Sequence, residues 1–220
     1  MTDLRTGGAG AVSMKHLSVE GQKTVGFLGT GAIARNMARA AAAIRPGGYE
    51  GLAYGIDSAM AEQFASEMMA ELGPDKFKMT AVSTAEELCG NADVIFTQTP
   101  GSSTVIEKSW LPAGGPSGFG TTIIASGSDQ PTKQELPNDL LAASKYISDL
   151  TRQTSKLGEL RGAMGAGVMT LDDVHAELGQ VVNGDKTGRE GDELIVVDLT
   201  GTGAQDAAIG QVAWDKLSML

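Results

Sequence analysis

Short apolar runs alternate with segments of helical periodicity along most of the chain. Residues 23–28 (KTVGFL) are mainly apolar and run into glycines. Residues 58–72 instead place Ala61, Phe64 and Met68 on one helical face. A continuous apolar run bounded by turn residues is typical of a strand covered on both faces, and a spacing of three or four residues is typical of an amphipathic helix. The pattern therefore predicts that strands and helices alternate.

The other elements follow by the same reasoning. Strands are also expected at residues 51–56, 79–82, 93–97, 120–125, 146–149 and 193–198. Helices are also expected at residues 9–18, 32–43, 139–144 and 204–217. Ser83 and Glu86 have the spacing of a capping box, and a shorter helical piece opens at Thr170, three residues before Asp173. Strands separated by helices form a parallel sheet covered on both faces, so the sequence predicts an α/β fold.

A glycine-rich turn joins the first predicted strand to the next helix. It is formed by Gly29, Thr30, Gly31, Ala32, Ile33 and Ala34. In this context Gly29 permits a tight turn, Gly31 lets the backbone approach a pyrophosphate, and Ala34 allows close packing of the helix on the sheet. The free N–H groups at the helix N-terminus attract the anion. The sequence thus predicts a Rossmann-type, doubly wound, mostly parallel sheet that binds a dinucleotide; a glycine turn without a ligand is the alternative.

The end of the second predicted strand bears on the choice of cofactor. Asp57 lies there and could accept hydrogen bonds from the ribose hydroxyls, while its charge would repel a 2′-phosphate. No arginine or lysine occurs between Gly51 and Lys76. These features favour NAD without excluding NADP. As an alternative, Asp57 caps the helix that follows it.

Composition and charge narrow the class of protein. The 220 residues are 41% hydrophobic and 20% charged, as in an ordinary globular protein. The net charge of −10 would repel a nucleic-acid backbone and an anionic membrane surface, and no apolar stretch reaches the length of a membrane helix. Cys89 is the single cysteine, which excludes an intrachain disulfide and favours a reducing, cytoplasmic setting. We therefore expect neither nucleic acid nor a membrane as a partner.

Other classes of site find little support in the sequence. His16 and His175 are the only histidines, and they lie far apart without a cysteine or carboxylate cluster near either. A zinc site and a Ser-His-Asp hydrolase are therefore poorly supported, and no metal is expected. The sequence also lacks the G-x-x-x-x-G-K-[ST] motif of P-loop nucleotidases.

Several further segments follow one another in a recognisable order. They are residues 3–9 (DLRTGGA), 92–95 (ADVI), 97–100 (TQTP), 126–136 (SGSDQPTKQEL), 158–160 (GEL), 177–179 (ELG), 188–189 (GR) and 198–206 (DLTGTGAQD). Together with the glycine turn, this ordered set resembles the C-terminal, dinucleotide-binding portion of the ornithine cyclodeaminase/mu-crystallin family. The resemblance extends over nearly the whole chain.

The resemblance implies roles for individual residues. Asp129 matches the acid–base residue beside the nicotinamide, and Arg5 matches the arginine that pairs with the substrate carboxylate. The candidate cofactor contacts are Lys133, Thr97, Thr99 and Thr200. Judged without the resemblance, Asp129 is a polar turn residue and Arg5 and Lys133 are surface charges, and these interpretations stand as alternatives.

The chain departs from the family pattern in several places. Thr132 stands where a glycine is common, and Gly55 aligns better than Asp57 with the ribose-reading position. Residues 114–119 (GGPSGF) resemble an insertion. Family members also carry a substrate-binding and dimerising lobe ahead of the segment that matches residues 3–9, whereas this sequence begins almost at that segment.

The resemblance implies NAD(P)-dependent deamination of a basic amino acid, such as ornithine to proline and ammonia, by transient hydride transfer. One alternative is the reduction of a ketimine or cyclic imine, or another amino-acid dehydrogenation. Another is a non-catalytic NAD(P)H-binding protein, as on the mu-crystallin side of the family. The expected partner is an amino acid or cyclic imine, and the full-length family is expected to form homodimers.

We expect a single dinucleotide-binding domain over residues 1–220. It comprises a lead-in helix at residues 1–20, a Rossmann core at residues 21–200, and a C-terminal helix at residues 201–220 that returns toward the substrate lobe. Because that lobe is outside this sequence, dinucleotide binding is the expectation for this chain, and its catalytic activity by itself stays open.

Overall fold

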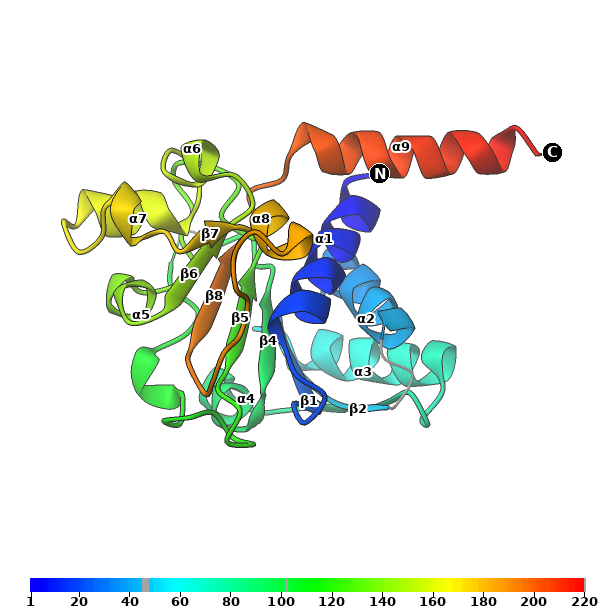
Figure 1. The fold of residues 1–220 in the computed structure, drawn as a ribbon. Helices are drawn as coiled ribbons and strands as arrows, with labels where there is room; N and C mark the ends of the chain where they lie inside the picture. The colour runs from blue at the N-terminus through cyan, green and yellow to red at the C-terminus, as the bar shows by residue number, and fades with distance from the viewer. Residues whose placement is uncertain (45–47, 102, 220) are drawn as a thin grey trace.

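An eight-stranded sheet forms the centre of the computed structural model, which describes residues 1–44, 48–101 and 103–219 (Figure 1). The strand order is β3-β2-β1-β4-β5-β8-β6-β7, and every neighbouring pair is parallel. The strands are β1 (Thr24–Leu28), β2 (Tyr49–Tyr54), β3 (Phe77–Ala81), β4 (Val94–Thr97), β5 (Thr122–Ala125), β6 (Lys145–Ser148), β7 (Ala176–Glu177) and β8 (Ile195–Asp198). The predicted α/β fold with a parallel sheet is confirmed.

Helices cover both faces of this sheet (Figure 1). The helices are α1 (Thr2–Leu17), α2 (Ala32–Ile44), α3 (Ser58–Leu72), α4 (Ala85–Asn91), α5 (Asn138–Ala142), α6 (Thr151–Thr154), α7 (Glu159–Gly165), α8 (Leu178–Asn183) and α9 (Gly203–Leu217), with the 3₁₀ turns η1 (Lys108–Trp110) and η2 (Leu171–Asp173). Helices α1, α2, α3 and α8 enclose one apolar core, and α4, α5 and α7 enclose another. The predicted doubly wound arrangement is therefore confirmed.

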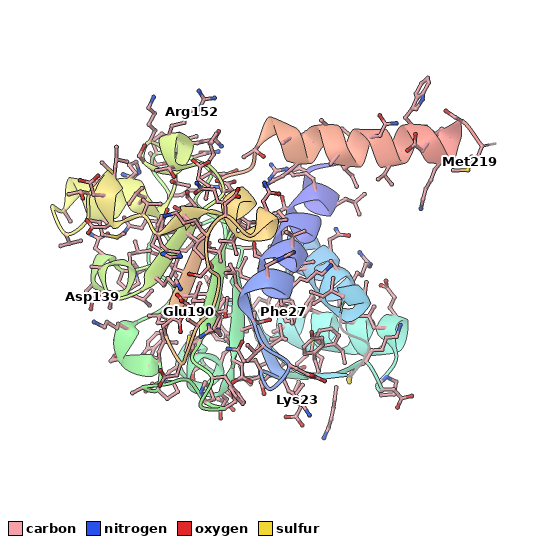
Figure 2. All side chains as sticks on the ribbon, in the orientation of Figure 1. Lys23, Phe27, Asp139, Arg152, Glu190 and Met219 are labelled. Atoms are coloured by element: carbon pink, nitrogen blue, oxygen red, sulfur yellow. The ribbon has the colours of Figure 1, made fainter. Side chains whose placement is uncertain are left out.

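Alternation along the strands divides the apolar side chains between the two cores. In β4, Val94 and Phe96 face the core under α1 to α3, while Ile95 faces the core under α4, α5 and α7. Phe27 of β1, which lies inside the body in Figure 2, stacks on Phe96 with ring centroids 5.5 Å apart and meets Phe64 of α3 edge-on at 5.5 Å. Fully burying a side chain of this size contributes about 1.5–3 kcal/mol.

Most predicted elements are found, with boundaries that differ by a few residues. The helix at residues 58–72 and the helical piece after Thr170 occur as expected. The second strand occupies Tyr49–Tyr54, two residues earlier than predicted, because Tyr49 is buried and pairs with Phe77 whereas Ile56 is fully exposed. The predicted stop after α2 includes residues 45–47, which lie outside the described residues.

Two helix starts differ from the positions that local patterns gave. The first helix occupies Thr2–Leu17, within the lead-in helix expected at residues 1–20 but starting before residue 9, where periodicity placed it, because tertiary packing outweighs the low helix propensity of its glycines. A Cβ on Gly7 would lie 2.8 Å from the Asn36 backbone, so this glycine lets α1 approach α2 closely. The capping pair at α4 is shifted by one residue: Thr84 accepts a hydrogen bond from the Glu87 N–H, in place of the predicted Ser83 and Glu86.

Helix α9 differs from the others because none of its residues is buried. It projects from the body, and Met219 follows its far end (Figures 1 and 2). Its first turn is held to α1 by an ion pair in which Arg5 Nε lies 3.3 Å from Asp206 Oδ1. Within the described residues, no helix combines the length and the hydropathy that crossing a membrane requires.

Candidate functional site

The loops that follow β1, β4 and β5 meet where these parallel strands end, which we call the carboxyl edge of the sheet. Open α/β sheets bind their ligands at this edge. Arg152 of α6 lies toward it in Figure 2, and Lys23, just before β1, lies at the opposite, amino edge. A cavity of about 200 Å³ opens at the carboxyl edge. It is lined by Ile33, Gln98, Thr99, Pro100, Ser126, Gly127, Asp129 and Lys133.

The glycine turn lies beside this cavity and has the geometry that its sequence predicts. Gly29 has φ +95°, and a Cβ there would lie 2.9 Å from the carbonyl oxygen of Gln98, so a larger residue is excluded both by the backbone conformation and by space. A Cβ on Gly31 would meet nothing within 4 Å, which leaves the backbone approachable. Ala34, in the first turn of α2, is fully buried.

Gln98 connects this turn to the cavity, and the sequence analysis did not single it out. Its Nε2 donates to the carbonyl oxygens of Leu28 at 2.9 Å and Gly29 at 2.6 Å. Its Oε1 is buried and has no hydrogen-bond partner among the residues that the structure describes. A buried acceptor without a partner is costly, and here it belongs to a side chain that lines the cavity. It is therefore available to a donor on a ligand.

Asp129 and Lys133 form an ion pair at the mouth of the cavity. Lys133 Nζ donates to Asp129 Oδ1 at 2.8 Å. The Asp129 side chain is half exposed, at 51%, and that of Lys133 is largely buried, at 21%. The aspartate is thus open to a small molecule from solvent while the lysine holds it in place.

The two threonines after β4 bond to a buried carboxylate beneath the cavity. Thr97 Oγ1 donates to Glu135 Oε2 at 2.7 Å, and Thr99 Oγ1 donates to Glu135 Oε1 at 2.8 Å. Thr99 lines the cavity, whereas Thr97 is fully buried and does not. Burial raises the pKa of Glu135, against the effect of these hydrogen bonds.

A second group of buried acids lies next to Glu135. Glu159 at the start of α7 accepts hydrogen bonds from the hydroxyl of Ser128 and from the Glu135 N–H. Burial, with the nearby charge of Glu135 adding to it, raises the pKa of Glu159 to about 7. Asp198 at the end of β8 accepts from Tyr146 Oη at 2.6 Å, and burial together with Glu159 raises its pKa well above the usual range.

Arg5 and Thr200 lie at the end of β8 and do not line the cavity. Thr200 Oγ1 donates to Asp149 Oδ1 at 3.0 Å. The Arg5 guanidinium occupies the space beside Gly201, where a Cβ would lie 2.5 Å from its Nη1. Because β5 and β8 are paired neighbours, Arg5 is at the strand end next to the one that leads to Asp129.

The structure places Asp57 as the N-cap of α3. Its Oδ1 accepts from the Ala59 N–H at 2.9 Å and the Met60 N–H at 3.3 Å. This is the capping role that the sequence analysis kept as an alternative. Gly55, the other candidate for the ribose-reading position, lies against the turn, since a Cβ there would be 3.2 Å from Thr30 Oγ1.

Comparison with known proteins gives consistent matches over the whole chain. The model of the ornithine cyclodeaminase/mu-crystallin family matches residues 1–219. Alanine dehydrogenase of Archaeoglobus fulgidus is 35% identical over 216 residues, which cover 98% of this chain and 63% of that protein. The chain therefore spans a little under two thirds of the length of such relatives.

Two solved structures show the same architecture. The Δ(1)-pyrroline-2-carboxylate reductase of Thermococcus litoralis, solved with NADH and L-proline, has a TM-score of 0.89 and 28% identity, over 98% of this chain and 64% of that one. The iminosuccinate reductase of Paracoccus denitrificans, solved with NAD⁺, has a TM-score of 0.83 and 34% identity, over 96% of this chain and 61% of that one.

Proposed function

The chain belongs to the ornithine cyclodeaminase/mu-crystallin family, and from this premise we propose that it binds NAD and contributes the acid–base group for interconverting an α-amino acid and its imine. The observation that carries the proposal is the cavity at the carboxyl edge. It joins the glycine turn and the free acceptor of Gln98 to the Asp129–Lys133 pair. When bound, NAD supplies the acceptor or donor of hydride.

The turn and Gln98 account for the binding of the dinucleotide. The space around Gly31, just before α2, is open, and a pyrophosphate placed there would be attracted by the N-terminus of α2. Gln98 Oε1 accepts a hydrogen bond from the same ligand, which removes the cost of its unpaired acceptor. Thr99 and Lys133 line the cavity and complete the proposed direct contacts, whereas Thr97 and Thr200 lie outside it and would support the loops that form it.

Asp129 performs the proton transfer in this proposal. As a carboxylate it accepts a proton from the substrate amine, and as an acid it returns one to the imine nitrogen. The 2.8 Å contact with Lys133 Nζ orients it before substrate binds. Arg5 binds the substrate carboxylate, in competition with its present partner Asp206.

NAD is the proposed cofactor, and the contribution of Asp57 is limited. Both cap bonds of Asp57 end on Oδ1, so Oδ2 is the atom that would accept from a ribose hydroxyl. Gly55 contributes no side chain at the neighbouring position. We propose that residues 1–220 act as one dinucleotide-binding domain, with NAD preferred over NADP by a modest factor.

Two reaction types fit this site. Imine reduction and amino-acid dehydrogenation are favoured by the relatives, whose names describe a dehydrogenase and two reductases acting on amino acids or imino acids. Cyclodeamination of a basic amino acid, such as ornithine to proline and ammonia, begins with the same oxidation and is the second candidate. Asp129 has the same role in both.

The test is turnover with NADH and a panel of imino acids, and with NAD and a panel of amino acids including ornithine, with release of ammonia measured in parallel. Asp129→Asn is expected to lower turnover at least about 100-fold and to leave NADH affinity within about twofold. Asp139→Asn on the exposed side of α5 is the matched control and changes neither quantity (Figure 2). Equal turnover by Asp129→Asn would contradict the assignment, and NADH binding by the wild-type chain without turnover of any substrate would favour a non-catalytic binder.

A further inference from the structure

The segment that carries Asp129 and Lys133 is tied at both of its ends by buried acids that the proposed chemistry does not use. Residues 126–136 run from the end of β5 toward α5. Their middle is exposed, and the two proposed functional side chains project there. Glu135, within the segment, and Glu159, at the start of α7, are both fully buried.

Glu135 ties the segment to the two strand ends that flank the cavity. Its Oε2 accepts from the Gly127 N–H at 2.8 Å, which joins the end of the segment to its beginning. Its Oε1 accepts from the Thr99 N–H at 2.6 Å, which joins the segment to the end of β4. A Cβ on Gly127 would lie 2.3 Å from the Glu135 carboxyl carbon, so Gly127 leaves room for the carboxylate to reach its N–H groups.

The first turn of α7 holds the same segment from the other side. Glu159 accepts from the Ser128 hydroxyl and from the N–H groups of Glu135 at 2.8 Å and Leu136 at 3.0 Å. Arg161 Nη2 donates to the carbonyl oxygen of Lys133 at 3.2 Å. These bonds hold the segment immediately before Asp129 and again at Lys133 and beyond.

We propose that Glu159 and Glu135 are positioning residues that form a buried clasp around residues 127–136 and thereby hold Asp129 and Lys133 beside the cavity. The positioning role of the clasp rests on the proposed function, because it concerns Asp129 and Lys133. The hydrogen bonds that form the clasp do not depend on that function. Glu159 is the central member, because it lies outside the segment and its single carboxylate contacts both ends of the segment.

The buried acids around Glu159 indicate that the clasp does more than stabilise the fold. Glu159 faces the carboxyl groups of Glu135 and Asp198, and Tyr146 of β6 also lies within its field. Burial, with the nearby charge of Glu135 adding to it, raises the pKa of Glu159 to about 7, so the charged form is unfavourable here. An apolar side chain would avoid the cost of a buried carboxyl group, but it would leave three buried donors of the segment without an acceptor.

Hydrogen exchange of the 220-residue chain without cofactor tests the clasp directly. Glu159→Gln is expected to speed exchange of the peptide covering residues 127–136 by at least about tenfold, because an amide has only one acceptor oxygen for the three donors. Asp93→Asn is the matched control: this buried acid also accepts three backbone N–H groups, but at the amino edge. It is expected to leave exchange of that peptide unchanged.

A milder variant keeps the test decisive if Glu159→Gln does not fold. Ser128→Ala removes one donor to Glu159 and is expected to give a smaller acceleration confined to the same peptide. Glu159→Gln or Ser128→Ala exchanging residues 127–136 no faster than Asp93→Asn would overturn the proposal.

The pH profile separates positioning from a merely structural effect. Opening the clasp exposes Glu159 to water, where its pKa is lower, so the closed form loses stability as the pH rises toward and through 7. Protection of residues 127–136 in the wild-type chain is therefore expected to fall as the pH rises from 4.5 to about 7, after correction for intrinsic exchange. Glu159→Gln should make this fall smaller, leaving the contribution of Glu135, and a profile with the same slope in both proteins would count against the clasp.

Titration with NADH distinguishes failure of the clasp from failure of the proposed function. Glu159→Gln is expected to weaken NADH binding about fivefold, and Asp93→Asn less than twofold. Absence of NADH binding by the wild-type chain would defeat the proposed function, while the exchange result would still decide whether the clasp exists. Normal NADH binding by Glu159→Gln would show that the clasp does not position the cofactor contacts.

Discussion

The two edges of the sheet use buried charge in opposite ways. At the amino edge, Asp93 and Arg189 form hydrogen bonds to backbone groups and so connect the loops there. At the carboxyl edge, four acids cluster beneath the loops, and burial raises the pKa of each: Glu135, Asp149, Glu159 and Asp198. Like charges gathered in the interior oppose stability, so the carboxyl edge keeps an arrangement that folding alone would not favour.

Arg189 and Asp93 show how the amino edge is built. The Arg189 guanidinium donates to the carbonyl oxygens of Leu17 at 3.0 Å and Glu193 at 2.6 Å and to Thr122 Oγ1 at 2.8 Å. Asp93 accepts from three backbone N–H groups, those of Lys23 and Thr24 at the start of β1 and that of Ser117 in the loop before β5. These bonds join the starts of several strands. The comparison indicates that the amino edge fastens the fold, whereas the carboxyl edge holds the proposed site.

The largest effect that separates the two edges is expected from Gly29→Ala. At φ +95° the new Cβ would be strained and would lie 2.9 Å from the Gln98 carbonyl oxygen, so the turn must shift. NADH affinity, measured by calorimetry, should fall on the order of a hundredfold. Gly73→Ala is the control, because Gly73 has φ +87° with nothing within 4 Å of the added Cβ. Gly73→Ala should lower the free energy of unfolding and keep the NADH affinity of the wild-type chain. Equal NADH affinities in Gly29→Ala and Gly73→Ala would contradict a special role for the turn at the carboxyl edge.

The acids of the carboxyl edge predict how stability depends on pH. Burial raises the pKa of Glu159 to about 7, so the folded chain binds its proton more tightly than the unfolded chain does. The stabilisation is complete below the unfolded pKa and is lost as the pH rises through 7, which amounts to a loss on the order of 3 kcal/mol. Urea unfolding between pH 5 and 8 measures it.

Asp198→Asn sharpens the same prediction. Both hydrogen bonds to Asp198, from Tyr146 Oη and the Leu160 N–H, end on Oδ2, so an asparagine oxygen can accept both. The variant removes one of the acids facing Glu159 and should make the pH profile flatter. An unchanged slope would show that the carboxyl-edge acids do not act on one another.

The amino edge should affect stability without affecting binding. Arg189→Leu removes a donor from the carbonyl oxygens of Leu17, Thr121 and Glu193, and is expected to cost about 1–3 kcal/mol of unfolding free energy. NADH affinity should remain within twofold. Arg152→Leu, an exposed arginine at the carboxyl edge, is the control for loss of charge and should change neither quantity. If Arg189→Leu lowered NADH affinity and Arg152→Leu did not, the amino edge would also contribute to binding, which would contradict the comparison.

The smallest effect is expected on the outer surface, away from both edges. Arg39 Nε on α2 and Glu71 Oε1 on α3 form a solvent-exposed ion pair at 2.6 Å. Such pairs are screened by water and salt. Arg39→Ala should therefore change neither Tm nor NADH affinity measurably. A clear loss of Tm or of NADH affinity would show that surface ion pairs contribute to stability or binding as much as the two edges do.

Local patterns were sufficient to predict the fold and one side of the site. The apolar strand runs and the turn from Gly29 to Ala34 act through contacts near in sequence, and both are found. Periodicity alone placed the start of α1 too late, because packing of Gly7 on α2 is not visible in helix propensity. In contrast, the capping role of Asp57 could be predicted as an alternative, because its hydrogen bonds reach only two and three residues along the chain.

The clasp acids could not be predicted in the same way. Glu135 and Glu159 look like ordinary acids near helix starts, and their bonds connect residues up to 38 positions apart. Their segments were noticed only through family resemblance. Gln98 was hidden for a similar reason, because its two bonds reach back 70 and 69 residues to the end of β1 and the turn.

The central claim is that the carboxyl edge, with its glycine turn and the free acceptor of Gln98, is a dinucleotide site. Calorimetric titration of the 220-residue chain with NADH tests it most directly, followed by the same titration with NADPH. We predict saturable binding at one site per chain, with NADH the tighter of the two. No binding of either nucleotide at millimolar concentration would contradict the account.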